Sequence, residues 1–143
     1  MQGKCLCGRV EFELNGSIPR LYQCHCSLCR KVSGSSANAA LVIDAAQFRW
    51  LGGEEAISQY ESDTAFKSHF CRHCGSPVPN ATRNNSAYWV PVGLLQDDEA
   101  LKLAAHVYMD SRAQWDELAG GAECFAEMPD AATSECLFRP DGE

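Results

Sequence analysis

The sequence predicts a mainly β fold with few short helices. Residues 9–14 alternate polar and apolar side chains, which is the period of a strand with one buried face. The dipeptide Asn15-Gly16 follows and is a strong turn signal. Further short apolar segments are separated by similar turn signals, and no segment has a sustained repeat of 3.6 residues. These three observations together indicate short strands joined by tight turns.

The later strands follow in order along the chain. Segments rich in β-branched, aromatic or alternating apolar residues predict strands over residues 20–24, 37–43, 48–51, 56–60, 65–70 and 87–95. Pro91 lies inside the last of these and is typical of an edge or a bulge, because proline cannot donate to the ladder. Residues 102–109 alternate weakly and are compatible with either a strand or a helix.

Two segments have weaker helical features, and a third has no pattern. Residues 30–36 contain Gly34 and three serines, and we expect a loop or a single helical turn there. Residues 111–118 predict a short helix with Trp115 and Leu118 facing inward. Residues 129–143 are weakly apolar and contain two prolines, so we expect a surface tail. The predicted organisation is therefore one zinc-binding domain over residues 1–128, followed by a C-terminal tail over residues 129–143.

Charge and hydropathy restrict the partners. The chain of 143 residues has a formal net charge of −7, and an acidic protein gains little attraction for nucleic acid phosphates. The longest apolar run, residues 39–43, is far shorter than a membrane span. The first residues are polar and have no apolar signal core, so we expect a cytoplasmic protein. We expect neither a nucleic acid nor a membrane partner, and the sequence gives no oligomeric state.

Cysteine is the most informative residue type, with nine in the chain. An odd number in a reducing compartment argues against a disulfide framework and favours metal ligands. Cys5 and Cys7 form one closely spaced pair, Cys71 and Cys74 form another, and a glycine directly follows each pair. Two such pairs supply the four ligands of a closed, structural zinc site. The alternative is that they are ordinary buried thiols.

The second cysteine group is Cys24, Cys26 and Cys29, which supplies three sulfurs from six residues. The candidates for a fourth ligand are His25, His69, His73, His106, Cys124 and Cys136. The alternating backbone points His25 away from its two neighbours, and Cys124 and Cys136 have no neighbour with ligand spacing. We expect His73, inside the other cysteine pair, to be exposed, and His69 to be a partly buried, hydrogen-bonded strand residue. We therefore expect one coordination position to stay open, which is the arrangement of a catalytic zinc.

Three segments, residues 4–14, 24–34 and 68–78, resemble in order and spacing the signature of a known family. This is the glutathione-dependent formaldehyde-activating enzyme family, also called the centromere protein V domain family. Residues 106–118 resemble its late segment with a tryptophan. The resemblance implies coiled antiparallel β-sheets around two zinc ions per chain. It implies a structural zinc at Cys5, Cys7, Cys71 and Cys74, and a catalytic zinc at Cys24, Cys26 and Cys29.

The resemblance also implies carbon–sulfur lyase chemistry. The expected reaction joins a thiol, glutathione or a similar molecule, to a small aldehyde such as formaldehyde, or cleaves the adduct. Because glutathione is anionic and the chain is acidic, Arg30 and Lys31 next to the second group are the candidate substrate-binding residues. Solvated surface charges are the alternative for both. The alternative function is a zinc-stabilised structural or protein-binding module without catalysis. A zinc ribbon for nucleic acid is disfavoured by charge, and a thiol reductase would depend on Cys124.

Overall fold

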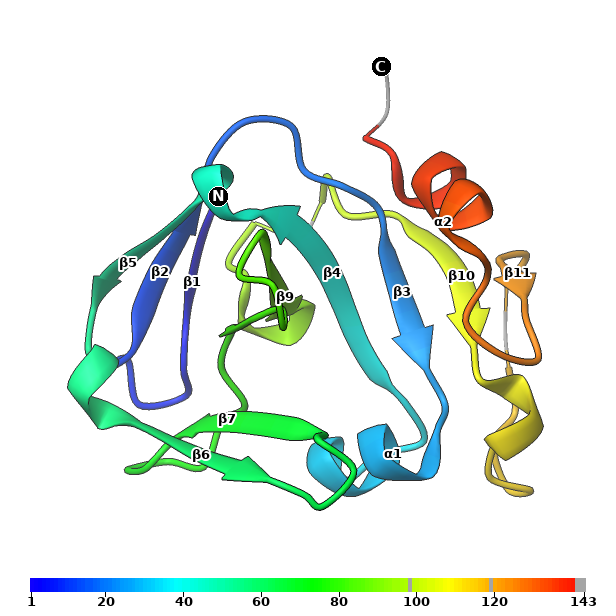
Figure 1. Ribbon diagram of the computed structural model, residues 1–143, viewed down its shortest axis with the longest axis horizontal. Coiled ribbons are helices and arrows are strands. Elements are labelled where there is room, and N and C mark those ends of the chain that lie inside the picture. Colours follow the sequence, from blue (N-terminus) through cyan, green and yellow to red (C-terminus); the bar gives the residue numbers. More distant parts are fainter. Residues whose placement is uncertain (98, 119, 141–143) are drawn as a thin grey trace. The chain divides into compact units, whose positions relative to one another are not determined.

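The computed structural model describes residues 1–97, 99–118 and 120–140 (Figure 1). The chain divides into two compact units. The first comprises Met1–Ile18 and Val42–Ala100, and the second comprises Pro19–Leu41 and Leu101–Glu143. The first cysteine group lies wholly in the first unit, and the second group lies wholly in the second. None of the helices in the described ranges has the length and apolar character needed to cross a membrane.

The first unit consists of short antiparallel strands. One sheet has the order β1 (Gln2–Lys4), β2 (Glu11–Leu14) and β5 (Phe48–Gly52). Two further antiparallel pairs are β6 (Ile57–Glu61) with β7 (Lys67–Cys71), and β8 (Asn80–Ala81) with β9 (Ala87–Pro91). Single 3-10 turns, η1 (Ala45–Gln47), η2 (Glu54–Ala56) and η3 (Val92–Leu94), connect or follow these strands.

The alternation in residues 9–14 builds the core of the first unit. Val10, Phe12 and Leu14 are 0%, 0% and 1% exposed. Full burial of an apolar side chain of this size contributes about 1.5–3 kcal/mol. The Phe12 ring stacks on Phe48 at a centroid distance of 5.6 Å and meets Trp50 edge-on at 6.1 Å. The apolar face of β2 therefore packs against aromatic side chains of β5 and stabilises the pairing of these two strands.

The second unit contains both helices and the strands that carry the second cysteine group. Its elements are β3 (Leu21–Cys24), α1 (Ser27–Ser33), β10 (Leu103–Val107), η4 (Met109–Ser111), β11 (Glu123–Cys124) and α2 (Ala131–Phe138). Strand β4 (Asn38–Asp44) begins in this unit and ends in the first. β3 pairs antiparallel with β4 and parallel with β10, and β10 pairs parallel with β11. Figure 1 shows β3 and β10 side by side, with α2 next to β10.

The predicted mainly β fold with few helices is confirmed, and each predicted strand has a counterpart. The ambiguous segment 102–109 contains a strand, β10. Besides the expected antiparallel pairs, the second unit contains two parallel pairs, both formed by β10. Pro91 is the last residue of β9. Its missing N–H therefore does not interrupt the hydrogen bonds between strands, because the strand ends there.

Two local predictions are wrong. Residues 112–118 form no helix, and Trp115 is 69% exposed rather than inward-facing. In this segment Ala113 is the buried residue, at 6% exposure, so there is no apolar face to stabilise a helix. Residues 30–36 were expected to form at most one turn, but Ser27–Ser33 forms a seven-residue helix.

The predicted tail also contains regular structure, helix α2. The Asp130 carboxylate caps it by accepting from the Thr133 N–H at 2.8 Å. Its last residue, Phe138, packs against the Tyr22 ring at 5.4 Å, and its carbonyl accepts from the Arg20 N–H at 3.0 Å. The domain boundary at residue 128 stays a prediction.

Candidate metal centres

The first cysteine group is built from two turns of similar geometry. Cys5 donates its N–H to the Val10 carbonyl and accepts from Gly8, at 3.0 and 2.9 Å. Cys71 donates to the Ser76 carbonyl and accepts from Gly75, at 2.9 and 2.8 Å. Both glycines have φ of 76°, a left-handed conformation that other residues adopt only with strain. The glycine after each cysteine pair is thus what lets each turn present two sulfurs to one side.

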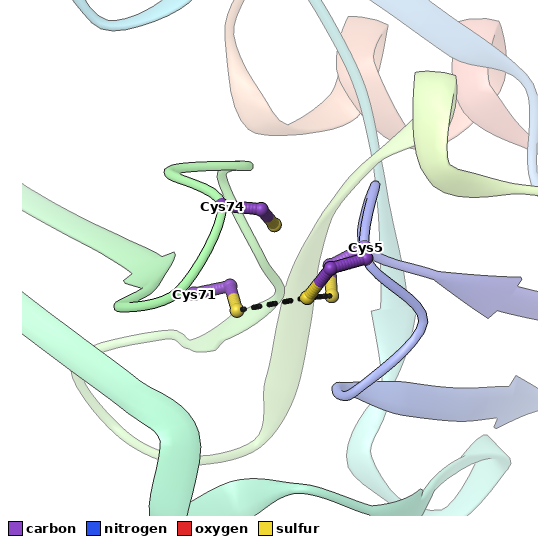
Figure 2. Close-up of side chains that lie close together, drawn as sticks. Cys5, Cys71 and Cys74 are labelled. Atoms are coloured by element: carbon purple, nitrogen blue, oxygen red, sulfur yellow. Dashed lines mark hydrogen bonds between the residues drawn. The ribbon is translucent and has the colours of Figure 1, made fainter.

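The four sulfurs of this group fit a tetrahedral zinc ion. The Cys5 and Cys7 sulfurs are 3.6 Å apart, and those of Cys7 and Cys71 are 3.8 Å apart. All four lie within 4.8 Å of one another. Tetrahedral Zn–S bonds of about 2.3 Å place sulfurs about 3.8 Å apart. Figure 2 shows Cys71, the last residue of β7, and Cys74, from the turn that follows it, facing Cys5 across this space.

Hydrogen bonds favour the thiolate form at two of these sulfurs, Cys5 and Cys74, by lowering their pKa values. The Val10 N–H donates to the Cys5 sulfur at 3.3 Å. The Cys74 sulfur lies 3.4 Å from the Ser76 hydroxyl, whose oxygen also accepts from the Leu6 N–H at 3.0 Å. Hydrogen bonding with the Ser76 side chain and backbone lowers the pKa of Cys74 to about 5. A cysteine with this pKa is deprotonated at neutral pH, as a zinc ligand must be.

The first group is also part of a hydrophobic core. Cys5 and Cys71 are 2% and 0% exposed, and they pack in one cluster with Val10, Ala56 and Val78. A metal ion held there would join this core to both turns. The arrangement is that of a structural site, in which the ion contributes directly to folding.

The second cysteine group lies where strand β3 meets helix α1. Cys24 is the last residue of β3, Cys26 is the N-cap of α1, and Cys29 lies in the first turn of that helix. The Cys26 sulfur accepts from the Cys29 N–H at 3.3 Å, so this thiol performs the capping role that serine or aspartate usually performs. The three sulfurs lie within 4.8 Å of one another. Among the described residues, no fourth histidine, cysteine or carboxylate ligand atom joins the group.

The charges of this group are mutually dependent. A hydrogen bond with Cys29 lowers the pKa of Cys24 to about 6, although burial acts in the opposite direction. The same hydrogen bond and burial raise the pKa of Cys29 well above its usual range. The two sulfurs therefore share a proton, because adjacent negative charges repel. A divalent cation would remove this repulsion and allow all three sulfurs to ionise, so the donor set fits zinc.

The predicted alternatives for a fourth ligand lie outside the group. Both ring nitrogens of His25 are hydrogen-bonded elsewhere, to Asp116 and His106. His73, Cys124 and Cys136 are exposed, and His69 is half-buried in β7; none of these side chains joins either cysteine group in the described structure.

The candidate substrate-binding residues occupy the last turn of α1. Lys31 is exposed and Arg30 is half-buried. The Arg30 Nε is the one buried side-chain nitrogen or oxygen without a hydrogen-bond partner in the described ranges. Cations also interact favourably with a helix C-terminus, which gives both residues a structural role as well. The missing partner of Arg30 Nε is the feature that points to an absent acceptor.

Sequence reasoning missed Tyr108. It follows Val107, which pairs with Cys24, and it has φ of 57° and ψ of 43°. A left-handed tyrosine is strained, and such strain concentrates at functional sites. Burial, and then the negative charge of Cys24, raises the pKa of this phenol. A single aromatic residue at the end of a strand is ordinarily a core residue, and the one signal that covered this position was the resemblance of residues 106–118 to the family's late segment.

The sequence of this chain is similar to a known family and to individual members of it. Residues 1–111 match the family described as glutathione-dependent formaldehyde-activating enzyme. A Halomonas elongata protein that bears the same family name is 25% identical over 155 residues, covering 94% of this chain and 92% of that protein. An uncharacterised lyase of Schizosaccharomyces pombe is 25% identical over 125 residues, covering 87% and 89%.

A solved structure shares the fold. The crystal structure of a Rhodobacter sphaeroides protein aligns with a TM-score of 0.54 and 30% identity, covering 73% of this chain and all of that one. The family match extends over most of the chain and includes both cysteine groups. The chain therefore belongs to the glutathione-dependent formaldehyde-activating enzyme family.

Proposed function

We propose that this protein is a zinc-dependent, carbon–sulfur lyase-like enzyme that joins a thiol to a small aldehyde or cleaves the adduct. The observation that carries the proposal is the second cysteine group, where three sulfurs converge and no fourth protein ligand joins them in the described residues. A site of three protein ligands leaves a position for substrate, unlike the four-sulfur first group. Glutathione or a similar thiol and formaldehyde are the substrates that the family name suggests.

The reaction is an addition. The thiol sulfur forms a bond to the carbonyl carbon, the carbon–oxygen π bond breaks, and the thiol proton ends on the oxygen of the S-hydroxyalkyl product. The reverse reaction breaks the same carbon–sulfur bond. A zinc ion bound by Cys24, Cys26 and Cys29 supplies positive charge that favours the thiolate form of a substrate thiol.

The remaining groups bind the substrate and hold a proton. Arg30, with its unpartnered Nε, binds a carboxylate of the thiol, and the exposed Lys31 adds a weaker attraction. A tyrosine keeps its phenolic proton at neutral pH, and the raised pKa of Tyr108 extends this to higher pH, so the hydroxyl can donate a hydrogen bond near the cysteines. The name of the Schizosaccharomyces pombe relative, a lyase, supports the class of reaction.

The proposal includes two zinc ions per chain, a structural one at Cys5, Cys7, Cys71 and Cys74 and a catalytic one at the second group. Elemental analysis of protein purified without chelator should give two zinc ions per chain. One ion or none would contradict the two-site assignment. Bound iron would contradict the assignment of the metal as zinc, since thiolates also bind iron. The cytoplasmic location predicted from the sequence stays a prediction.

The decisive experiment uses cobalt-substituted protein, whose absorption bands report the number of sulfur ligands. Glutathione should shift the bands of one site only, and S-methyl glutathione, which has no free thiol, should have a much weaker effect. Cys24→Ala should abolish the shift and leave the bands of the four-cysteine site unchanged. If glutathione causes no shift, or if the S-methyl form is equally effective, the enzyme assignment is wrong and a zinc-stabilised binding module is the better description.

A further inference from the structure

A chain of three polar side chains is buried in the second unit. The His25 Nδ1 lies 3.0 Å from the Asp116 Oδ2, and the His25 Nε2 lies 2.9 Å from the His106 Nδ1. The side chains of His25 and Asp116 are 1% and 9% exposed, and His106 is 5% exposed. Sequence separations of 91 and 81 residues show that tertiary structure assembles this chain. Neither the zinc sites nor the proposed reaction uses it.

His25, the central residue of this hydrogen-bonded network, lies between two cysteine ligands in the sequence. His25 separates Cys24 from Cys26, and its own backbone N–H donates to the Val107 carbonyl at 3.0 Å. Both nitrogens of its ring are hydrogen-bonded, one to Asp116 and the other to His106, so neither is free to bind a metal. The flanking residues are anchored separately: Cys24 is paired in β3, and Cys26 caps α1. The His25 ring is therefore the side-chain anchor of the connection between β3 and α1.

The hydrogen bonds also determine where the protons lie. An ionised Asp116 only accepts, so the His25 Nδ1 carries a proton. When both rings are neutral, the His25 Nε2 has no proton and accepts from the His106 Nδ1. Both histidines are then in the Nδ1–H tautomer. Both ring nitrogens of His25 have a partner in this buried network, and rotation of the ring would leave them unpaired, so the network holds His25 in one orientation.

We infer that His25 is a positioning residue, held by Asp116 and His106, that fixes Cys24 and Cys26 in the geometry needed to hold a metal ion and accept a thiol. The part of this inference that concerns the thiol rests on the proposed function. The part that concerns the sulfurs does not depend on any substrate. Groups that orient metal ligands in this way typically change metal affinity or activity by about 10–100-fold when removed.

The first test is Asp116→Ala, with Asp110→Ala as the matched control at an exposed carboxylate of the same segment. In cobalt-loaded protein, Asp116→Ala should change the bands of the second site, leave those of the four-cysteine site unchanged, and weaken glutathione binding by about tenfold. Asp110→Ala should match the wild-type protein in all three respects. If Asp116→Ala leaves the second site's bands unchanged, the inference is wrong.

The second test requires no variant and no substrate. The chain has four histidines, so two-bond ¹⁵N–¹H spectra of the labelled, zinc-loaded protein at neutral pH can resolve each ring. Two rings should be in the Nδ1–H tautomer. Nε2–H tautomers at both His25 and His106 would overturn the inference even if Asp116→Ala fails to fold. If the tautomers and cobalt bands behave as expected but the wild-type protein binds no thiol, the proposed function fails and the positioning role remains.

Discussion

The two cysteine groups differ in how the chain assembles them. The first brings together two pairs from distant segments, with Cys7 and Cys71 at a sequence separation of 64, and two of its sulfurs belong to the buried core of the first unit. The second takes three sulfurs from one short connection, and Cys26 and Cys29 are only half-buried. Cysteine thus forms both a group of four sulfurs next to a hydrophobic core and a group of three sulfurs, with room for one more ligand, at the start of a helix.

This difference indicates that the first group stabilises the fold and the second group binds substrate. Ligands from distant segments close a long loop, so a bound ion there stabilises the folded state against the unfolded chain. Ligands from one local segment close almost no loop, and a metal ion there adds little such stabilisation. The local group instead has reactive surroundings: a strained tyrosine, an arginine nitrogen without a partner, and a buried histidine chain.

The largest effect is expected from Cys71→Ser. This change removes one sulfur from the first group at a position that is 0% exposed. Loss of a structural metal site is among the few mechanisms that cost more than about 4 kcal/mol. Thermal unfolding should therefore occur roughly 10 °C or more below the wild-type midpoint.

The matched variant in the second group is Cys26→Ser. Serine is a preferred N-cap, so the hydrogen bond from the Cys29 N–H has a replacement acceptor and stability should change by less than about 1 kcal/mol. Glutathione binding should nevertheless be lost. Equal losses of thermal stability in the two variants would contradict the division between a structural and a reactive group.

A smaller effect is expected from Arg30→Gln, which removes the charge and the unpartnered Nε from the second unit. The KM for glutathione should rise by about tenfold, the usual consequence of losing one hydrogen bond to a charged group. Kinetics with Arg83→Gln, at an exposed arginine of the first unit, provide the control. If both variants raise KM equally, Arg30 contributes only to the general charge of the protein.

The smallest effect is expected from Tyr108→Phe. The change removes only the hydroxyl, so unfolding should shift by no more than about 0.5 kcal/mol, while kcat should fall by about threefold because one donor is lost. Because burial raises the pKa of Tyr108, the phenol stays protonated to a higher pH than a free tyrosine. The difference in kcat between wild type and variant should therefore persist from pH 7 to about 10, the usual tyrosine pKa. Equal kcat values over this range would exclude a role for the hydroxyl.

Much of this protein follows from local sequence. The alternation of Val10, Phe12 and Leu14 predicted a buried strand face, and spacing alone predicted both cysteine groups that the structure assembles. These features depend on neighbours in the chain: period two in a strand, and a glycine that lets a turn present two sulfurs. Strand period and turn geometry act within a few residues, so local sequence specifies the strand face, each cysteine pair and the group of three. The meeting of the two distant pairs at Cys7 and Cys71 depends on tertiary structure.

Tertiary structure alone determined the rest. Residues 111–118 do not form the predicted helix, because no apolar partner covers Trp115, whereas residues 131–138 form an unpredicted helix with Phe138 against Tyr22. His106 meets His25 because β10 pairs with β3, and Asp116 reaches the same ring from the segment after β10. Such contacts join residues with no sequence spacing in common, and their free energy depends on burial, which no local pattern specifies.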